Sequence, residues 1–376
     1  MQNTLFSLYS KDFPKYHYFY NSSELGQIHQ VIPWHELSRL IPAKKPLVGA
    51  PSWLDNEGMF ALMFLKHYTK ISDEKLVERL NSDACFQLFC GIKNDLFLQP
   101  IKDKTLVTRV RKYLSIHLDV SKLQSKMIDF WKPEMKDKNV MMVDATCFEV
   151  DLRFPTDVKL LWESVSWLWE EQIPSLCKAF KIPIPRSKFV DQKLKQSSYQ
   201  KNRKNSFKKT QKRRKALLHL LDKGIKAYQL LLNQTSAVNL SQKVAERFKT
   251  IKIVYQQQAY LLGNKTTKVA DRIVSLSQPH IRPIVRGKEN KPVEFGIKVH
   301  MAQVNGINMI EHHSFEAFNE TTRLKISILK HENQFGKLSH LAADGIYPTN
   351  KNRKHCSKKG IQTNFVRKGG GKDDKA

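Results

Sequence analysis

The stretch KNVMMVDATCFEV, residues 138–150, decides how the rest of the chain is interpreted. Within it, the apolar residues 140–143 run without interruption into an acid, Asp144. A short apolar run of this kind fits a strand buried on both faces of a sheet, although periodicity alone does not distinguish it from a buried helix. An ionised Asp at the end of such a strand is expected to have a charged or hydrogen-bonding partner or a functional role, because burying an unpaired charge is costly. Asp144 is therefore the first candidate site residue.

The same pattern returns in LSHLAADGIY, residues 338–347. Leu341, Ala342 and Ala343 lead into Asp344, and Gly345 then allows a tight turn. Two carboxylates at the carboxyl ends of neighbouring strands can hold a divalent metal ion between them. The sequence therefore predicts a metal site formed by Asp144 and Asp344.

The charge of the chain indicates a polyanionic partner. Its 376 residues include 64 Lys and Arg against 35 Asp and Glu, a formal net charge of +29. Such an excess favours nucleic acid or an anionic membrane surface. No apolar run approaches the length of a membrane span, and the N-terminus does not have the pattern of a signal peptide, so we expect nucleic acid and no membrane. The five cysteines form no CxxC pair, which predicts reduced thiols in the cytosol and no zinc site.

The N-terminal part predicts an irregular arm followed by a helical domain. Residues 1–57 are rich in aromatic residues and Pro and show no sustained period, so we expect an arm or a few short helices there. Residues 58–135 hold three helical patterns: an apolar one from Gly58, a second that Ser72 can cap, and a third over residues 103–118. The outer face of this domain is basic, which is typical of a solvated surface and also of a module that contacts DNA; the net charge favours the second interpretation.

Residues 178–215 hold a dense series of Lys and Arg against a single acid, Asp191. Self-repulsion predicts a segment that stays extended or loosely ordered until phosphates neutralise it. Tyr199 and Phe207 lie within this basic tract, where aromatic rings can stack on bases. A solvated basic linker is the alternative interpretation, and the charge density favours contact with DNA. The residues predicted to bind DNA in this tract are Lys201, Arg203, Lys204, Lys208, Lys209, Lys212, Arg213, Arg214 and Lys215.

The remaining patterns predict a mixed α/β sheet with helices on its faces. Thr156 is a plausible N-cap, and we interpret the nearby acids, Asp157 among them, as caps or surface charges. Apolar stripes over residues 217–232 and 244–262 predict a helical pair inserted between strands, with coiled-coil dimerisation as the alternative. The alternation over residues 295–302 predicts a half-buried strand, and Asn305-Gly306 predicts a hairpin turn. A helix over residues 319–331, the strand that ends at Asp344, a short helix and a final strand follow.

Four blocks of the sequence resemble DDE transposases of bacterial insertion sequences. The blocks keep the order found in that family. They are MFALMFLKHYTKISDEKLVERLNSDACFQLFCGI from residue 59, VDATCFEVDLRFPTD from residue 143, SQPHIRPIVRGKENKPVEFGIK from residue 277 and AADGIYPTNKNRKHCSKKGI from residue 342. The resemblance implies an all-α N-terminal domain and an RNase H-like mixed sheet over residues 136–366, with a helical insertion over residues 156–270 after the first strand.

The resemblance also implies a mechanism and a set of site residues. Asp144 and Asp344 match the first and second catalytic acids of the family, which hold two Mg²⁺ or Mn²⁺ ions. One ion activates water or a DNA 3′-hydroxyl, and the other stabilises the leaving oxygen. Cations and an acid of the third block would support this site. Arg282, Arg286 and Lys288 would bind phosphates. Glu294 would be structural or support the metal ligands, with direct metal binding as the alternative. We interpret His280, His312 and His313 as packing residues, with a role as catalytic bases as the alternative.

The sequence departs from the family pattern at the third acid. The family has a Glu on a helix well after the second Asp, whereas this sequence contains no Glu after Glu332 and ends in a Gly-rich charged tail over residues 367–376. We therefore expect a truncated or frameshifted product. The resemblance implies an active transposase that binds the terminal inverted repeats of its element and target DNA, as a homodimer, at the nucleoid in the bacterial cytoplasm. The alternative is an inactive DNA-binding relic or regulator, and an unrelated RNase H-like nuclease is disfavoured by the four blocks.

Overall fold

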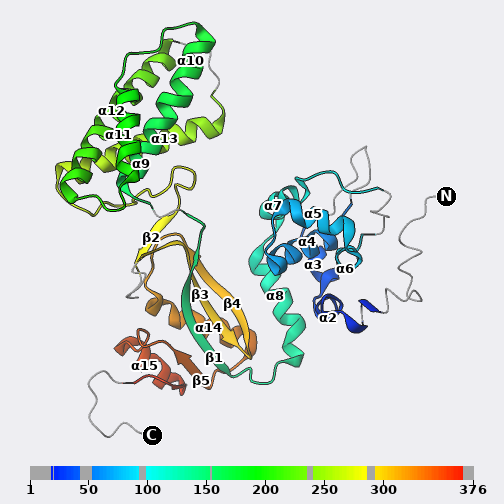
Figure 1. Cartoon of the computed structure of the whole chain (residues 1–376). Coiled ribbons are helices and arrows are strands. Elements are labelled where there is room, and N and C mark those ends of the chain that lie inside the picture. Colours follow the sequence, from blue (N-terminus) through cyan, green and yellow to red (C-terminus); the bar gives the residue numbers. More distant parts are fainter. Residues whose placement is uncertain are drawn as a thin grey trace. The chain divides into compact units, whose positions relative to one another are not determined.

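The computed structural model describes residues 18–19, 21–42, 53–92, 99–152, 155–234, 240–285 and 293–366. The chain divides into two compact units, Met1–Lys136 and Asp137–Ala376. Figure 1 labels their helices and strands. The described helices include none that is long and apolar enough to cross a membrane.

The regular secondary structure that is described in the first unit consists of helices. Ser72 caps α5 by accepting a hydrogen bond from the backbone N–H of Lys75, as the sequence predicts. The predicted helix over residues 103–118 is also present as α7, slightly shorter. The described helices are α2 (Glu24–Gln30), α3 (Trp34–Ser38), α4 (Asn56–Thr69), α5 (Asp73–Ser82), α6 (Ala84–Phe89), α7 (Leu106–His117), α8 (Val120–Trp131) and the 3-10 turn η2 (Lys132–Glu134).

The described residues before residue 58 include the short helices α2 and α3, the second of the two possibilities that the sequence leaves open for this segment. Trp34 on α3 packs edge-on against Phe89 on α6, with 5.4 Å between the ring centroids. Phe19, Leu25 and Leu37 belong to the same buried cluster as the apolar residues of α4, α5 and α7. These helices lack a sustained period because they are short, so the sequence did not reveal that they complete the core.

The second unit begins with strand β1 (Val140–Glu149), and five helical segments plus a π-helical turn follow it. Together these helical segments form the helical insertion, which groups around one apolar core (Figure 1). They are α9 (Asp157–Ser166), η3 (Trp167–Gln172), α10 (Ile173–Phe180), α11 (Phe189–Lys201), α12 (Phe207–Gln234) and α13 (Gln242–Gly263).

The basic tract is helical, so the prediction of an extended or loosely ordered segment is wrong. It contributes all of α11 and the first turns of α12. Three polar residues of the tract, one on α12 and two on α11, join its two helices despite the charge repulsion. The guanidinium of Arg213 donates to the side-chain oxygens of Gln196 and Gln192 at 2.8 and 2.7 Å and so joins α12 to α11.

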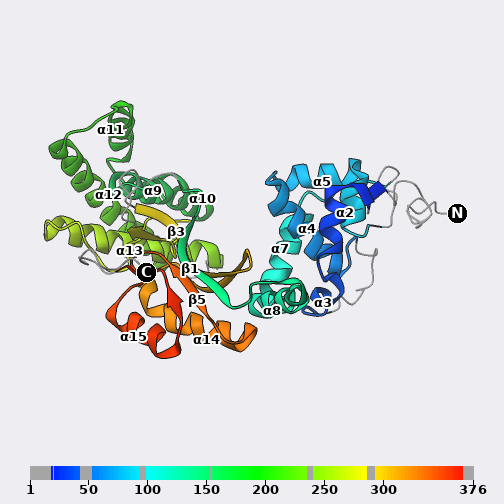
Figure 2. The same ribbon diagram turned by 90° about the horizontal axis from the view of Figure 1, so that it is seen from below.

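The sheet is mixed, as the sequence predicts, with the order β2-β3-β1-β5-β6 and β4 also paired with β3. β1 is antiparallel to β3 and parallel to β5, and β5 is parallel to β6. Helix α14 contacts β1, and Figure 2 shows α14 and α15 on the same side of the strands. The elements after the insertion are β2 (Arg282–Val285), β3 (Val293–Val304), β4 (Ile307–Ser314), η4 (Glu320–Arg323), α14 (Leu324–Phe335), β5 (His340–Ala343), α15 (Asn350–Lys359) and β6 (Gln362–Thr363).

Two predictions about individual strands need correction. β1 is not buried on both faces: Met141 and Val143 are buried, whereas Met142 between them is 53% exposed. In β3 the apolar and polar residues alternate as predicted, but the polar face is the more buried one: His300 is fully buried and Glu294 is 6% exposed, whereas Phe295, Ile297 and Met301 are half-buried. The polar partner of His300 is Glu311 on the neighbouring strand β4, and the alternation within one strand does not reveal such a partner.

Candidate functional site

Asp144 and Asp344 come together through the pairing of β1 with β5. The parallel register pairs Met142 with Ala342 and Val143 with Ala343. Continued by one residue, this register sets Asp144 beside Asp344 at the point where β5 ends. Neighbouring strands lie about 4.8 Å apart, and paired residues of parallel strands project from the same face of the sheet. Asp144 is thus in the middle of its strand, whereas the sequence predicts it at the end.

Local hydrogen bonds orient both carboxylates. Oδ1 of Asp144 accepts a hydrogen bond from the backbone N–H of Ala145 at 2.7 Å. Oδ1 of Asp344 accepts one from the backbone N–H of Gly345 at 2.5 Å, in the predicted turn. Both Asp residues are exposed, so their charge needs no internal partner. Both carboxylates are accessible to a ligand from solvent.

The two carboxylates of Asp144 and Asp344 suit a hard divalent cation that takes its remaining ligands from water or substrate. In the part of the chain that the structure describes, no group of three or more His, Cys, Asp or Glu residues could hold a metal ion. Mg²⁺ binds through one or two carboxylates and takes its remaining ligands from water and substrate phosphates. The pair Asp144 and Asp344 fits that pattern of binding. It does not fit a closed structural site, which takes all its ligands from the protein.

A buried polar layer supports β3 from the helix-covered side. Nδ1 of His300, opposite Ala145 in the register, lies 3.2 Å from a carboxylate oxygen of Glu311 on β4. Ser327 on α14 donates a hydrogen bond to the same oxygen. The ammonium of Lys298 lies 2.6 Å from the carboxylate of Glu320 on η4. The layer therefore ties β3, the strand that pairs with β1 beside Asp144, to β4 and to two helical elements.

Tyr347 adds a neutral phenol to this region. Its side chain is fully buried, and its ring lies 6.0 Å from that of His300. Burial raises the pKa of the Tyr347 hydroxyl, and the negative charges of Glu320, Asp144 and Asp344 raise it further. The phenol is therefore protonated at any physiological pH. Sequence reasoning missed this layer because Lys298 and His300 look like the solvent face of a half-buried strand.

The predicted DNA-binding residues of the basic tract separate into two groups. Arg213 and Arg214 are buried, and their guanidinium groups are bound inside the unit, so they are not available to DNA. Helical spacing explains this, because both residues fall on the side of α12 that faces α11 and α13. The other seven residues are exposed: Lys201, Arg203, Lys204, Lys208, Lys209, Lys212 and Lys215. We call these seven residues the exposed cation group.

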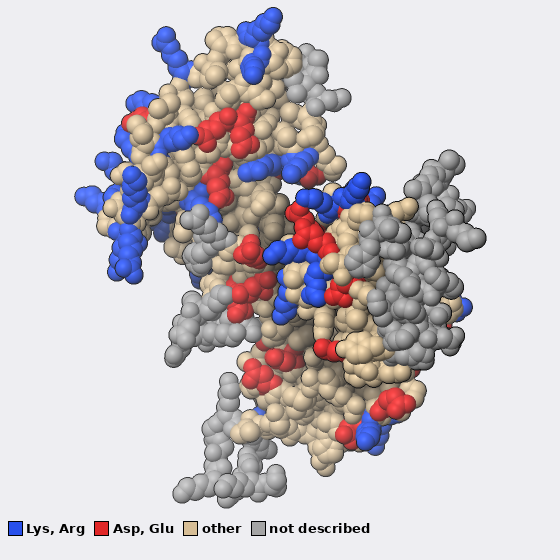
Figure 3. All heavy atoms as spheres, turned by 45° about the vertical axis from the view of Figure 1, so that its right-hand side comes forward, with Lys and Arg blue, Asp and Glu red and all other residues tan. Residues whose placement is uncertain are grey.

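The exposed cation group belongs to the helical insertion, where Lys and Arg side chains project from the surface in Figure 3. Arg282 lies elsewhere, in β2, and its Nη1 donates to the carbonyl oxygens of Pro279 and Ile281 at 2.5 and 3.2 Å. Its guanidinium thus fixes the local backbone. Arg286 and Lys288 lie outside the described residues.

The acid of the third block is buried, whereas the histidines of the third and following blocks are more accessible. Glu294 is buried in β3. His280 and His313 are exposed, and His312 is half-buried. His280 packs edge-on against Phe315, and His312 packs edge-on against Phe318, with centroid distances of 4.6 and 4.8 Å. Burial lowers the pKa of His312, which favours its neutral form.

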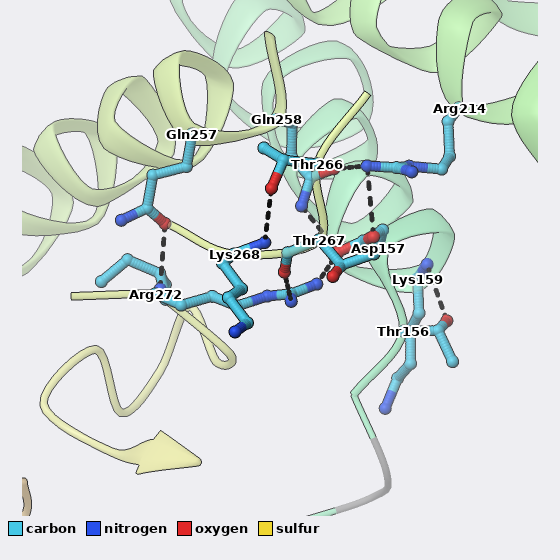
Figure 4. A network of polar contacts seen from close by, with 11 residues as sticks. Thr156, Asp157, Lys159, Arg214, Gln257, Gln258, Thr266, Thr267, Lys268 and Arg272 are labelled. Atoms are coloured by element: carbon cyan, nitrogen blue, oxygen red, sulfur yellow. Dashed lines mark hydrogen bonds and ion pairs between the residues drawn. The ribbon is translucent and has the colours of Figure 1, made fainter. Parts of the chain in front are cut away.

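Asp157 has a larger role than the cap that the sequence predicts. Its carboxylate lies 3.2 Å from the guanidinium of Arg214 on α12 and 2.7 Å from that of Arg272 (Figure 4). Gln258 on α13 donates to Asp157 at 2.8 Å and accepts from Arg214 at 3.0 Å. This network, the Asp157 junction, connects the first turn of α9 to both long helices of the insertion.

Comparison with known proteins finds a family match in the first unit. Residues 12–113 match the family described as Transposase domain (DUF772). No curated protein and no solved structure matches the chain. The matched segment lies in the helical first unit and includes residues of α2 to α7. This match supports placing the chain in a transposase family.

Proposed function

We propose that the protein is a DDE-type transposase that cuts and joins DNA at the ends of its own insertion sequence, with Asp144 and Asp344 as metal ligands. The observation that carries the proposal is the parallel register that brings these two acids together from distant parts of the chain. The match of the first unit to a transposase domain supports the same function independently.

We further propose that the sheet is an RNase H-like core. Its central strand β1 has the antiparallel β3–β4 hairpin on one side and the parallel strands β5 and β6 on the other. The insertion follows β1 directly, as the resemblance to DDE transposases implies. This topology brings a carboxylate from the central strand next to one from its parallel neighbour, which is the geometry that the proposed chemistry requires.

The chemistry divides between the two acids and the basic surface. Asp144 and Asp344 would hold Mg²⁺ or Mn²⁺, which would supply Lewis-acid activation of the scissile phosphate and of the attacking oxygen. The pairing of Asp144 with Met301 on β3 fixes the backbone of Asp144, and the turn at Gly345 fixes Asp344. Exposed Lys and Arg residues would hold the DNA backbone and position the scissile bond.

A second candidate function is a DNA-binding regulator that occupies the ends of the element without cutting them. The observation in its favour is that the described residues hold two carboxylates at the site and no third metal ligand beside them. Under either function the expected partners are the terminal inverted repeats and target DNA, with a homodimer forming on the DNA at the nucleoid.

The deciding experiment is end cleavage with the purified full chain. The substrate is duplex DNA that carries the two ends of the genetic element surrounding the gene, with Mg²⁺ or Mn²⁺ as the metal. A transposase nicks at the ends, and Asp144→Ala abolishes nicking while DNA affinity stays within about twofold, because the exposed cations supply most of the binding. Sequence-specific binding without nicking in either metal would favour the regulator instead.

A further inference from the structure

The first described turn of α12 exposes an aromatic ring that the protein core does not use. The side chain of Phe207 is 79% exposed, although an apolar core lies along the same helix from Leu217 onward. Ser206 accepts a hydrogen bond from the backbone N–H of Lys209 and so begins the helix just before Phe207. Phe207 is therefore held on an ordered helical turn and remains accessible to a ligand.

The cations around this ring are not neutralised within the described residues. No ion pair involves any member of the exposed cation group in the part of the chain that the structure describes. Other cations of α11 differ: Lys193 pairs with Glu170, and Lys195 pairs with Asp191 at 2.8 Å. Positive charge is thus left uncompensated on residues that flank Phe207, among them Arg203, Lys204 and Lys208.

Internal hydrogen bonds hold the α11–α12 connection in place. The hydroxyls of Tyr199 and Thr210 lie 3.0 Å apart and join the two helices. The side-chain amide of Asn205 donates to the backbone oxygen of Tyr199 at 3.1 Å. Arg213 fastens the next turn of α12 to Gln192 and Gln196 of α11. Tyr199 thus serves the fold, whereas Phe207 is presented to solvent and is more exposed than Phe180, another exposed aromatic residue of the basic tract (79% against 42%).

We propose that Phe207, together with the exposed cation group, forms a binding element for unpaired DNA bases, with the ring stacking on a base and the cations holding the adjacent phosphates. Base stacking on an aromatic side chain needs an accessible ring face, and unpaired strands carry phosphates that follow the bases closely. A duplex without exposed bases would use only the cations. This inference rests on the proposed function, because strand transfer exposes unpaired bases at DNA ends.

An anionic membrane surface would also attract cations and an aromatic ring, but the local pattern disfavours it. A helix that lies on a membrane needs a continuous apolar face. The neighbours of Phe207 on the first turn of α12 are Ser206, Lys208 and Lys209, which are all polar. The transposase-domain match also favours DNA over lipid.

The test measures binding of the full chain in EDTA, so that cleavage plays no part. The probes are a single-stranded oligonucleotide that contains 2-aminopurine and the same oligonucleotide in a duplex. We expect Phe207→Ala to weaken single-strand binding about tenfold, the typical cost of losing one stacked base, and to leave duplex binding within about twofold. Wild-type protein should quench the single-stranded probe, and Phe207→Trp should retain both affinity and quenching.

Val190→Ala is the matched control, because Val190 on α11 is also exposed (72%) but aliphatic. The proposal is overturned if Phe207→Ala binds the single strand like wild type, if it weakens both probes equally, or if Val190→Ala has the same effect. It is also overturned if Phe207→Ala reduces binding to phosphatidylserine vesicles and leaves DNA binding unchanged. None of these outcomes depends on nicking, so they separate failure of this inference from failure of the proposed catalytic activity.

Discussion

Asp144 and Asp344 each directly follow one member of the pair Val143 and Ala343, which is the last pair in the parallel register of β1 with β5, although the two acids come from opposite ends of the second unit's sequence. The insertion, the β3–β4 hairpin and α14 all lie between them in the chain. The two carboxylates therefore meet only when the sheet has formed. Because the pair depends on the fold, a substitution of Asp344 tests the proposed metal site as directly as a substitution of Asp144.

Asp344→Asn should reduce metal-dependent nicking by at least about 100-fold, since even residues that only support metal ligands cost 10- to 100-fold when changed. The amide keeps the shape of the side chain and can still accept the hydrogen bond from Gly345, so folding should be preserved. The measurement is nicking against Mg²⁺ concentration. Asp151→Asn is the control, because Asp151 is an exposed acid just after β1, and equal losses in the two variants would contradict the role of Asp344.

The salt dependence of DNA binding should respond to the exposed cations. Changing Lys208 and Lys209 to Gln removes two unpaired charges, so the slope of log affinity against log salt should become shallower by about 1.8 for duplex DNA. The same double change at Lys193 and Lys195, which are already paired with acids, should alter the slope by less than half as much. Fluorescence anisotropy over a range of salt concentrations measures both. Deleting the tract would be a poor test, because Arg213 would be lost from the core.

These results show which features a sequence pattern predicts and which depend on distant partners. Thr156 caps α9 through Lys159, and Asn305-Gly306 forms the β3–β4 turn with positive φ at both residues, because such signals lie within a few neighbouring residues. The two apolar runs that precede Asp144 and Asp344 form part of β1 and β5, which are neighbouring strands of the sheet. By contrast, the burial of His300 depends on Glu311, and that of Arg214 depends on Asp157, and neither partner follows from local periodicity.

The Asp157 junction should contribute strongly to the stability of the insertion. Arg214 has a side chain that is only 10% exposed, so Asp157→Ala leaves a mostly buried guanidinium without its carboxylate partner. Removing one member of a buried pair typically costs about 3 kcal/mol, and the partial exposure of Asp157 lowers our expectation to about 2 kcal/mol. Urea unfolding followed by circular dichroism measures this loss. Asp222→Ala breaks the exposed pair with Lys226 and should cost less than about 1 kcal/mol, so similar losses would argue against the junction.

The first unit should lose stability in acid through Asp73. A hydrogen bond from Arg111 lowers the pKa of Asp73 from 3.8 to about 2, against an opposing effect of burial, and Lys66 and Thr108 assist. Because the pKa is lower in the folded state, the stabilisation is present above pH 4 and disappears as the pH falls through 2. Allowing for solvent screening, it amounts to about 1–2 kcal/mol.

Asp73→Asn should therefore lower the free energy of unfolding at pH 7 by that amount and remove part of its decline between pH 4 and 2. Urea unfolding of the full chain at a series of pH values tests this, with α-helical signal as the readout. Glu74→Gln is the control, because Glu74 pairs with Lys104 at the surface and lies next in the sequence. If Asp73→Asn keeps the full acid dependence, another carboxylate is responsible.

Gly296 should be essential for the pairing of β3 with β1. A Cβ atom at this position would lie 2.1 Å from the backbone oxygen of Phe148 on β1, so Gly296→Ala forces two backbones apart. Backbone cannot rotate away as a side chain can, and we expect a loss of about 3 kcal/mol or more in the free energy of unfolding. Because Asp144 lies on the same strand as Phe148, nicking should fall even in protein that remains folded. The control is Gly263→Ala, because Gly263 lies at the end of α13 with open space around it, and this change should alter the free energy of unfolding by less than about 1 kcal/mol. If the Gly296→Ala variant is as stable as this control, β1 and β3 do not approach each other so closely.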